Sequence, residues 1–186
     1  AVGSAYTLMV FLISILLGLS MGSGTVFSLQ YGAGDLSALR RSIYVSLLLI
    51  GTVTILLNVA VFLWLDPILR WLQVPYDIYP LMRNYLWIIF WGIVFTFLYN
   101  FYAALLRAVG DSVTPLWFLA VSVVLNIGLD LFLILVLDQG IEGAAVATVI
   151  AQGTAASGIL LYTYKIRPEL RLHREDMRFD RSSLRE

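Results

Sequence analysis

Long uncharged stretches alternate with short charged ones along most of the chain. Asp, Glu, Lys and Arg are absent from residues 1–34, 42–65, 84–106, 112–129 and 143–164. A helix needs about 20 apolar residues to cross about 30 Å of hydrocarbon. The fourth stretch reaches that length once the apolar run Leu131–Leu137 beyond Asp130 is included. The pattern therefore predicts five membrane-spanning helices, at about residues 6–31, 42–65, 83–106, 114–137 and 142–164.

Composition supports an all-α polytopic membrane protein. Hydrophobic residues make up 60% of the 186 residues and charged residues 13%, against about 45–50% and about 25% in soluble domains. A soluble domain of this size could not bury so much apolar surface. Strands of a membrane barrel alternate in polarity over about 10 residues, and that alternation is absent here.

Short joints separate the first two spans and the third from the fourth. Gly32 and Gly34 suit the end of a helix, and Asp35 suits the N-cap of the next one. Gly110 with Asp111 repeats this arrangement, with Ser112 as a second candidate cap and Pro115 in the first turn.

The other two joints differ from these. Residues 66–83 are predicted to form a longer loop, because they contain three prolines and aromatic residues suited to a membrane interface. Gly140 and Gly143 are predicted to close the last hairpin.

The distribution of basic residues predicts the orientation. One side of the membrane, with loops 35–41 and 107–111 and the tail from Lys165, carries every Lys and Arg except Arg70 and Arg83. Cytoplasmic loops are enriched in Lys and Arg, so this side is predicted to be cytoplasmic. Residues 1–164 would form the bundle and residues 165–186 a charged cytoplasmic connector. The chain would then start outside, which predicts a further span upstream.

Asp130 is the strongest candidate for function. A carboxylate within a span costs about 2.5–3.5 kcal/mol on insertion scales, and such residues usually face a cavity and have a function. Asn126 lies one helical turn earlier on the same face. Carboxylate and amide oxygens suit a small cation such as Na⁺, or the carboxylate can carry a proton. The alternative is that both groups only hydrogen-bond neighbouring helices for packing. An Asp and an Asn on one face of a span favour the functional interpretation.

Span five begins with small residues, which let helices pack closely. Thr148 and Gln152 lie one turn apart on it and are predicted to hydrogen-bond between helices. The spans contain no His and the chain no Cys, so no enzymatic nucleophile, metal cluster or organic cofactor is predicted. The Gly-x-Ser-x-Gly pattern at residues 18–22 lies within a span, where packing explains it. A net charge of zero argues against nucleic-acid binding.

Four segments together resemble the multidrug and toxic compound extrusion (MATE) family. They are Tyr31-Gly-Ala-Gly-Asp35 followed by Arg40-Arg41, Leu106-Arg-Ala-Val-Gly-Asp-Ser-Val-Thr-Pro115, Asn126-Ile-Gly-Leu-Asp130, and Gly143-Ala-Ala-Val-Ala-Thr148-Val-Ile-Ala-Gln152. They occur in order and with similar spacing over nearly all of residues 5–165. The resemblance implies an antiporter of two six-helix lobes. This chain would supply helices two to six of the N-terminal lobe, and the first helix and the C-terminal lobe would be its missing partners.

The resemblance also implies roles for individual residues. Asn126 and Asp130 match the fifth helix's cation- or proton-binding pair, and Thr148 and the Ala144 backbone match the sixth helix's contribution. Many members have a proline after the aspartate, where this chain has Leu131.

The implied function is export of drug-like, often cationic, organic compounds across the cell membrane, coupled to Na⁺ or H⁺. Two alternatives remain. A lipid-linked oligosaccharide flippase of the same superfamily would be expected to carry basic residues in its cavity, and the centres of these spans have none. A structural membrane subunit would keep Asp130 paired and inaccessible.

Overall fold

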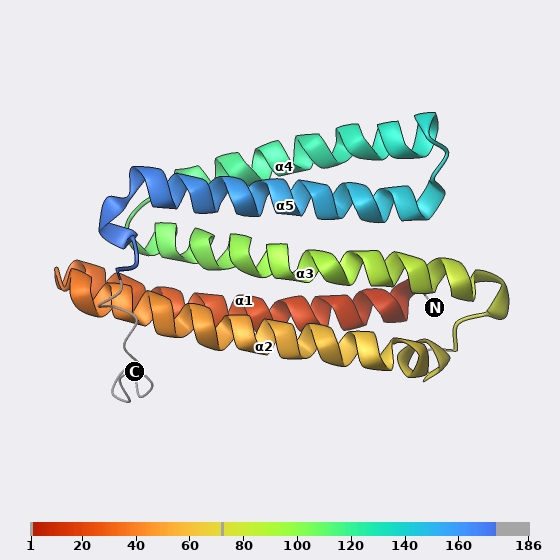
Figure 1. Cartoon of the computed structure of the whole chain (residues 1–186), viewed down its shortest axis with the longest axis horizontal. Helices are drawn as coiled ribbons and strands as arrows, with labels where there is room; N and C mark the ends of the chain where they lie inside the picture. Colours follow the sequence, from red (N-terminus) through yellow and green to blue (C-terminus); the bar gives the residue numbers. More distant parts are fainter. Residues whose placement is uncertain (1, 72, 174–186) are drawn as a thin grey trace.

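The computed structural model describes residues 2–71 and 73–173, which form five long helices lying side by side (Figure 1). Each is long and apolar enough to cross a membrane. Their bounds are α1 Val2–Gly32, α2 Leu36–Trp71, α3 Tyr79–Ala108, α4 Val113–Leu131 and α5 Gly140–Ile166. The predicted all-α fold with five spans is confirmed.

Helix α3 is the centre of the bundle. It packs against α5 on one side and against α1 and α2 on the other, as Figure 1 shows. Its buried side chains include Phe90, Phe101 and Leu105, and Phe101 packs edge-on against Phe27 of α1. Helix α4 lies at the edge, contacts mainly α5, and buries only Pro115. The bundle therefore holds α4 less firmly than any other helix.

The two predicted tight turns are confirmed. Gly34 and Gly110 adopt positive φ angles of 74° and 87°, which glycine adopts at little cost. The Asp35 carboxylate accepts a hydrogen bond of 2.9 Å from the backbone N–H of Ala38, and Asp111 likewise caps α4. Two details differ: Ser112 makes no side-chain cap bond, and Gly32 remains within α1.

The predicted loop at residues 66–83 is wrong in extent. Helix α2 continues through Pro67 to Trp71, and a short 3-10 turn, Tyr76–Ile78, leads directly into α3. A proline inside a helix clashes with the preceding turn and lacks an N–H. Here α2 accommodates Pro67 by a kink at Trp64, whose φ and ψ are −108° and 15°. Pro80 lies in the first turn of α3, where proline is favourable.

Beyond Asp130 the regular α-helix gives way to a π-helical turn, η2, Phe132–Val136. The Leu137 N–H bonds the carbonyl of Phe132, five residues earlier, at 3.2 Å. The residue after Asp130 is Leu131, so the change of helix type occurs without a proline at that position. Gly140, with a φ of 55°, closes the hairpin. Gly143 lies inside α5, where a Cβ would stand 3.2 Å from the Cβ of Leu133, so Gly143 lets η2 pack closely on α5.

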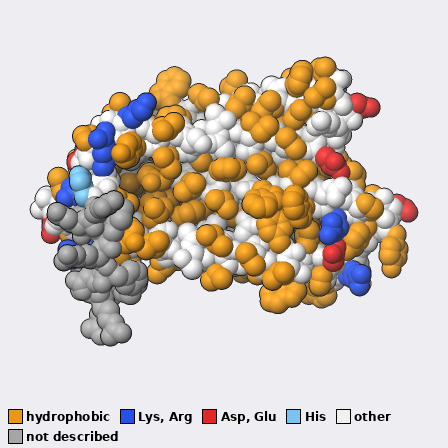
Figure 2. All heavy atoms as spheres, in the orientation of Figure 1, with side chains coloured by type: hydrophobic (Ala, Val, Ile, Leu, Met, Phe, Trp, Pro, Cys, Tyr) orange, Lys and Arg blue, Asp and Glu red, His pale blue; other side chains and the backbone are white. Residues whose placement is uncertain are grey.

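Described basic side chains gather at the end of the bundle with the Gly34 and Gly110 turns, at the left of Figure 2. Of the predicted connector, residues 165 and 166 continue α5, and the 3-10 turn η3, Pro168–Leu170, follows. Leu170 is buried against the core. Arg174, Arg178, Arg181 and Arg185 lie outside the described residues.

Candidate functional site

Three of the four predicted site residues form a hydrogen-bonded chain between α4 and α5. The side-chain nitrogen of Asn126 donates to the Thr148 hydroxyl oxygen at 3.4 Å. The Thr148 hydroxyl in turn donates to the backbone carbonyl of Ala144 at 2.9 Å. This bond uses the Asn126 side-chain nitrogen, so the side-chain oxygen remains able to accept a hydrogen bond or bind a cation. The structure thus joins an amide, a hydroxyl and a backbone carbonyl in one chain of contacts between α4 and α5.

Asp130 lies one helical turn beyond Asn126, at the last regular turn of α4. Its Oδ1 atom is buried and has no hydrogen-bond partner among the described residues. Leaving a buried polar atom unpaired costs free energy, and within a span an acid of this kind usually serves a site. The carboxylate and the neighbouring neutral oxygens suit a small hard cation or a proton. The π-helical turn that follows is of a type often found at functional sites.

The small residues of α5 bring α4 close enough for these contacts. One turn before Asn126, the Ser122 hydroxyl donates to the backbone carbonyl of Ala151 at 2.9 Å. Further along, Phe118 occupies the space left by Gly158, since a Cβ on Gly158 would stand 2.6 Å from the ring. The Ala and Gly positions of α5 therefore set the α4–α5 distance, as close packing of small residues predicts.

Gln152 turns toward α3 instead. A Cβ on Gly92 would overlap the Gln152 side-chain oxygen and stand 3.2 Å from Val149. The described residues give Gln152 no hydrogen bond, so its predicted bond between helices is not observed, whereas that of Thr148 is. The signal available in the sequence was Gly92 itself, because an isolated glycine within a helix often marks a close approach.

Asp111 forms a second polar cluster, at the basic end of the bundle. Its carboxylate accepts bonds from the backbone N–H of Thr114 (3.0 Å), the Thr114 hydroxyl (2.8 Å) and the Tyr162 hydroxyl (3.3 Å). Arg167 lies 3.7 Å away. Burial alone raises the pKa of Asp111, but the Thr114 and Tyr162 bonds and the Arg167 charge together hold it below its ordinary value. Thr114 lies at the start of α4, and Tyr162 and Arg167 lie at the end of α5, so the cluster ties the α3–α4 turn to the end of α5.

The described residues contain no group of three or more His, Cys, Asp or Glu side chains that could hold a metal ion. A monovalent cation bound by one carboxylate and several neutral oxygens needs no such group.

Comparison with known proteins gives consistent matches. The family model described as MatE matches residues 1–132. The probable multidrug resistance protein YpnP of Bacillus subtilis (strain 168) is 39% identical over 159 residues, which cover 86% of this chain and 36% of that protein. The multidrug export protein MepA of Staphylococcus aureus (strain NCTC 8325 / PS 47) is 32% identical over 170 residues, 87% of this chain and 37% of that protein. The chain thus spans well under half the length of these relatives.

Solved structures agree on the fold. An inward-facing multidrug resistance MATE family transporter of the MOP superfamily superposes with a TM-score of 0.91 at 22% identity, covering 99% of this chain and 42% of that one. An outward-facing conformation gives a TM-score of 0.90, covering 99% and 41%. The five-helix arrangement therefore resembles both conformations about equally.

Proposed function

This chain belongs to the MATE family of multidrug efflux transporters, and we propose that the intact protein exports drug-like organic compounds by exchanging them for Na⁺ or H⁺. Members of the family are transporters rather than enzymes, and the chain is a multi-pass protein of the cell membrane. Because it spans only 36–37% of YpnP and MepA, the export activity is proposed for the longer protein.

The observation that carries the proposal is the buried, unpartnered Oδ1 of Asp130, one turn from the Asn126–Thr148–Ala144 chain. An uncompensated negative charge within a span is unfavourable. Binding of Na⁺ or H⁺ would remove that charge. The Asn126 amide lies one turn from Asp130, and the Thr148 hydroxyl and Ala144 carbonyl are linked to this amide by hydrogen bonds, so these groups are the proposed source of neutral oxygens. Asp130 and Asn126 would be the main ligands of a bound Na⁺.

Ion binding at this site would act on the arrangement of the whole transporter. A ligand shifts a conformational equilibrium only by its different affinities for the two states. The similar superposition on inward-facing and outward-facing structures supports a five-helix unit that moves largely as one body. We propose that an ion entering from outside neutralises Asp130 and favours the arrangement that releases the organic compound.

The proposal is tested by Asp130→Asn in the intact protein reconstituted into liposomes, with ethidium as a probe of cationic substrates. Inward Na⁺ and H⁺ gradients are applied separately. We expect at least one gradient to drive ethidium efflux in the wild type and neither to drive it in Asp130→Asn. Asp138→Asn is the matched control, because Asp138 is exposed in the α4–α5 hairpin, and it should transport normally. Unchanged ion-driven efflux in Asp130→Asn would refute the proposal.

A further inference from the structure

At the end of the bundle opposite the basic cluster, α2 and α3 each carry a column of residues four apart. Residues at this spacing lie on one face of a helix. The α2 column consists of Phe62, Asp66 and Arg70, and the α3 column consists of Arg83, Trp87 and Trp91. Each column is aromatic toward the middle of the membrane and charged toward its edge.

The aromatic levels of the two columns touch each other. The Phe62 ring centroid lies 5.8 Å from that of Trp87 and 5.5 Å from that of Trp91, and the two tryptophans are 5.9 Å apart. Trp87 and Trp91 nevertheless remain 48% and 52% exposed. The cluster therefore packs on itself and leaves a broad aromatic surface facing outward from the described bundle.

The charged levels also meet. Arg83 Nε donates to Asp66 Oδ1 at 2.9 Å, and the Tyr79 hydroxyl donates to the same oxygen at 2.9 Å. Only one nitrogen of the Arg83 guanidinium is used in this way, and no described residue accepts a hydrogen bond from the other two. Arg70 forms no ion pair within 4.0 Å of a described carboxylate, but its side chain interacts with the Tyr79 hydroxyl and its charge acts on Asp66. The negative charge of Asp66 thus offsets only one of the two positive charges of Arg70 and Arg83.

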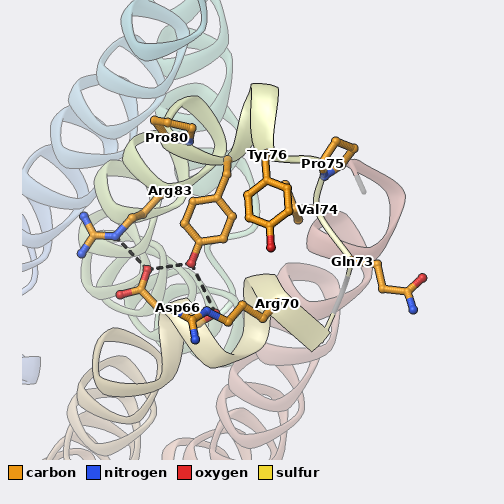
Figure 3. A pocket seen from close by; sticks show the side chains of 9 residues that line it. Asp66, Arg70, Gln73, Val74, Pro75, Tyr76, Pro80 and Arg83 are labelled. Carbon is orange, nitrogen blue, oxygen red and sulfur yellow. Dashed lines mark hydrogen bonds and ion pairs between the residues drawn. The ribbon is translucent and has the colours of Figure 1, made fainter.

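These side chains open into a hollow of about 1020 Å³ between the end of α2 and the start of α3. Figure 3 shows Asp66 and Arg83 linked on one side of it, with Arg70 and Tyr76 in the same close view. Tyr76 is 95% exposed at its edge. In Figure 2 an extended hydrophobic surface lies next to basic and acidic side chains near the right-hand end. The charged residues that line the hollow are Arg70, Arg83 and Asp66, so its lining carries a formal net charge of +1; Asp77 lies outside this lining.

We propose that this hollow binds the headgroup of an anionic phospholipid. The Arg70 guanidinium and the two Arg83 guanidinium nitrogens that Asp66 leaves unused match the oxygens of a phosphodiester. The glycerol and upper acyl chains would lie along Trp87 and Trp91. Tryptophan and tyrosine are enriched at the membrane interface, and basic pockets beside membrane helices bind lipid headgroups. The charged residues lie toward the membrane edge and the aromatic residues toward its middle, as the headgroup and acyl chains of a phospholipid do.

The first test measures lipid retention by native mass spectrometry of the intact protein, released from nanodiscs of phosphatidylglycerol and phosphatidylcholine. We expect phosphatidylglycerol to be retained preferentially and Arg70→Gln to weaken its binding about fivefold. Arg107→Gln is the control, since Arg107 is exposed at the opposite end of the bundle, and it should leave binding unchanged. Equal retention of the two lipids, or equal effects of both variants, would overturn the proposal. Displacement of the lipid by inorganic phosphate would instead indicate a site for a free anion.

A second test detects the bound lipid through Trp87 and Trp91 and does not depend on transport. A variant retaining only Trp87 and Trp91 as tryptophans is placed in phosphatidylcholine containing a little brominated phosphatidylglycerol. We expect stronger quenching than by the same amount of brominated phosphatidylcholine, and Arg70→Gln in this background should abolish the difference. Equal quenching by the two brominated lipids would contradict an anionic-lipid site.

Discussion

The side-chain nitrogen of Asn126 lies 3.4 Å from the hydroxyl oxygen of Thr148, and this contact joins α4 to α5 one turn from Asp130. Helix α4 buries only Pro115, so its position depends on a few contacts with α5. An ion bound beside Asp130 would therefore act on the helix that the bundle holds least firmly.

Replacing Thr148 by valine keeps the shape of the side chain and removes its hydroxyl. Asn126 then loses the acceptor of its hydrogen bond, and the site loses one oxygen. We expect the concentration of the coupling ion needed for half-maximal efflux to rise about tenfold, measured in proteoliposomes at several ion concentrations. Thr148→Ser retains the hydroxyl and should stay close to the wild type. Equal behaviour of the two variants would show that the hydroxyl has no part in ion binding.

Gly158→Ala tests the packing of α4 on α5. The added methyl group would stand 2.6 Å from the Phe118 ring, so the ring or the helix must move. Overpacking of this kind costs about 1–3 kcal/mol, which lowers the melting temperature of the protein. Thermal unfolding followed by tryptophan fluorescence should show the loss.

Gly128→Ala is the matched control for that experiment. A Cβ on Gly128, also within a membrane helix, meets nothing within 4 Å, and alanine favours a helix over glycine by about 1 kcal/mol. Its melting temperature should stay the same or rise. A similar fall for both variants would contradict the close α4–α5 packing described here.

Asp111→Asn tests the cluster at the basic end. The Asp111 side chain is 12% exposed, and hydrogen bonds to a charged group contribute about 1.5–3 kcal/mol each. We expect a melting temperature several degrees lower at pH 7. The pKa of Asp111 in the folded protein lies below its ordinary value of 3.8, so its charge stabilises the fold above about pH 4. That stabilisation disappears as the pH falls through the lowered pKa.

The difference in melting temperature between wild type and Asp111→Asn should accordingly be constant from pH 7 to pH 5 and shrink below pH 4. Asp138→Asn, at an exposed carboxyl, should show no such difference. A gap between wild type and Asp111→Asn that persists unchanged below pH 3 would mean that the charge of Asp111 is not what stabilises the cluster.

The sequence predicted the parts of the fold that depend on local chemistry. Five uncharged stretches became five helices, because a span must satisfy its backbone internally. Gly34 and Asp35, like Gly110 and Asp111, formed the expected turns because each pair acts on neighbouring backbone. The face shared by Asn126 and Asp130 followed from helical spacing alone.

The remaining features depend on contacts between distant segments. Charges and prolines made residues 66–83 resemble a loop, but a kink at Trp64 accommodates Pro67 and the Asp66–Arg83 pair lies where helix ends meet. The approach of Gln152 to Gly92 depends on how α3 packs on α5, and the contact of Leu133 with Gly143 depends on how the π-helical turn packs on α5. Composition and helical spacing do not encode these partners.

The most direct test of the central claim is modification of Asp130 by a carbodiimide in the intact protein, mapped by mass spectrometry. Carbodiimides react with protonated carboxyl groups that the reagent can reach. Modification is measured between pH 5 and 8, with Na⁺ or with an organic cation that does not bind, and exposed Asp138 serves as the internal reference. If Asp130 is the coupling site, it becomes modified, and the extent falls with added Na⁺ or changes with pH differently from Asp138. An Asp130 that stays unmodified under every condition, or changes only in parallel with Asp138, would contradict the assignment.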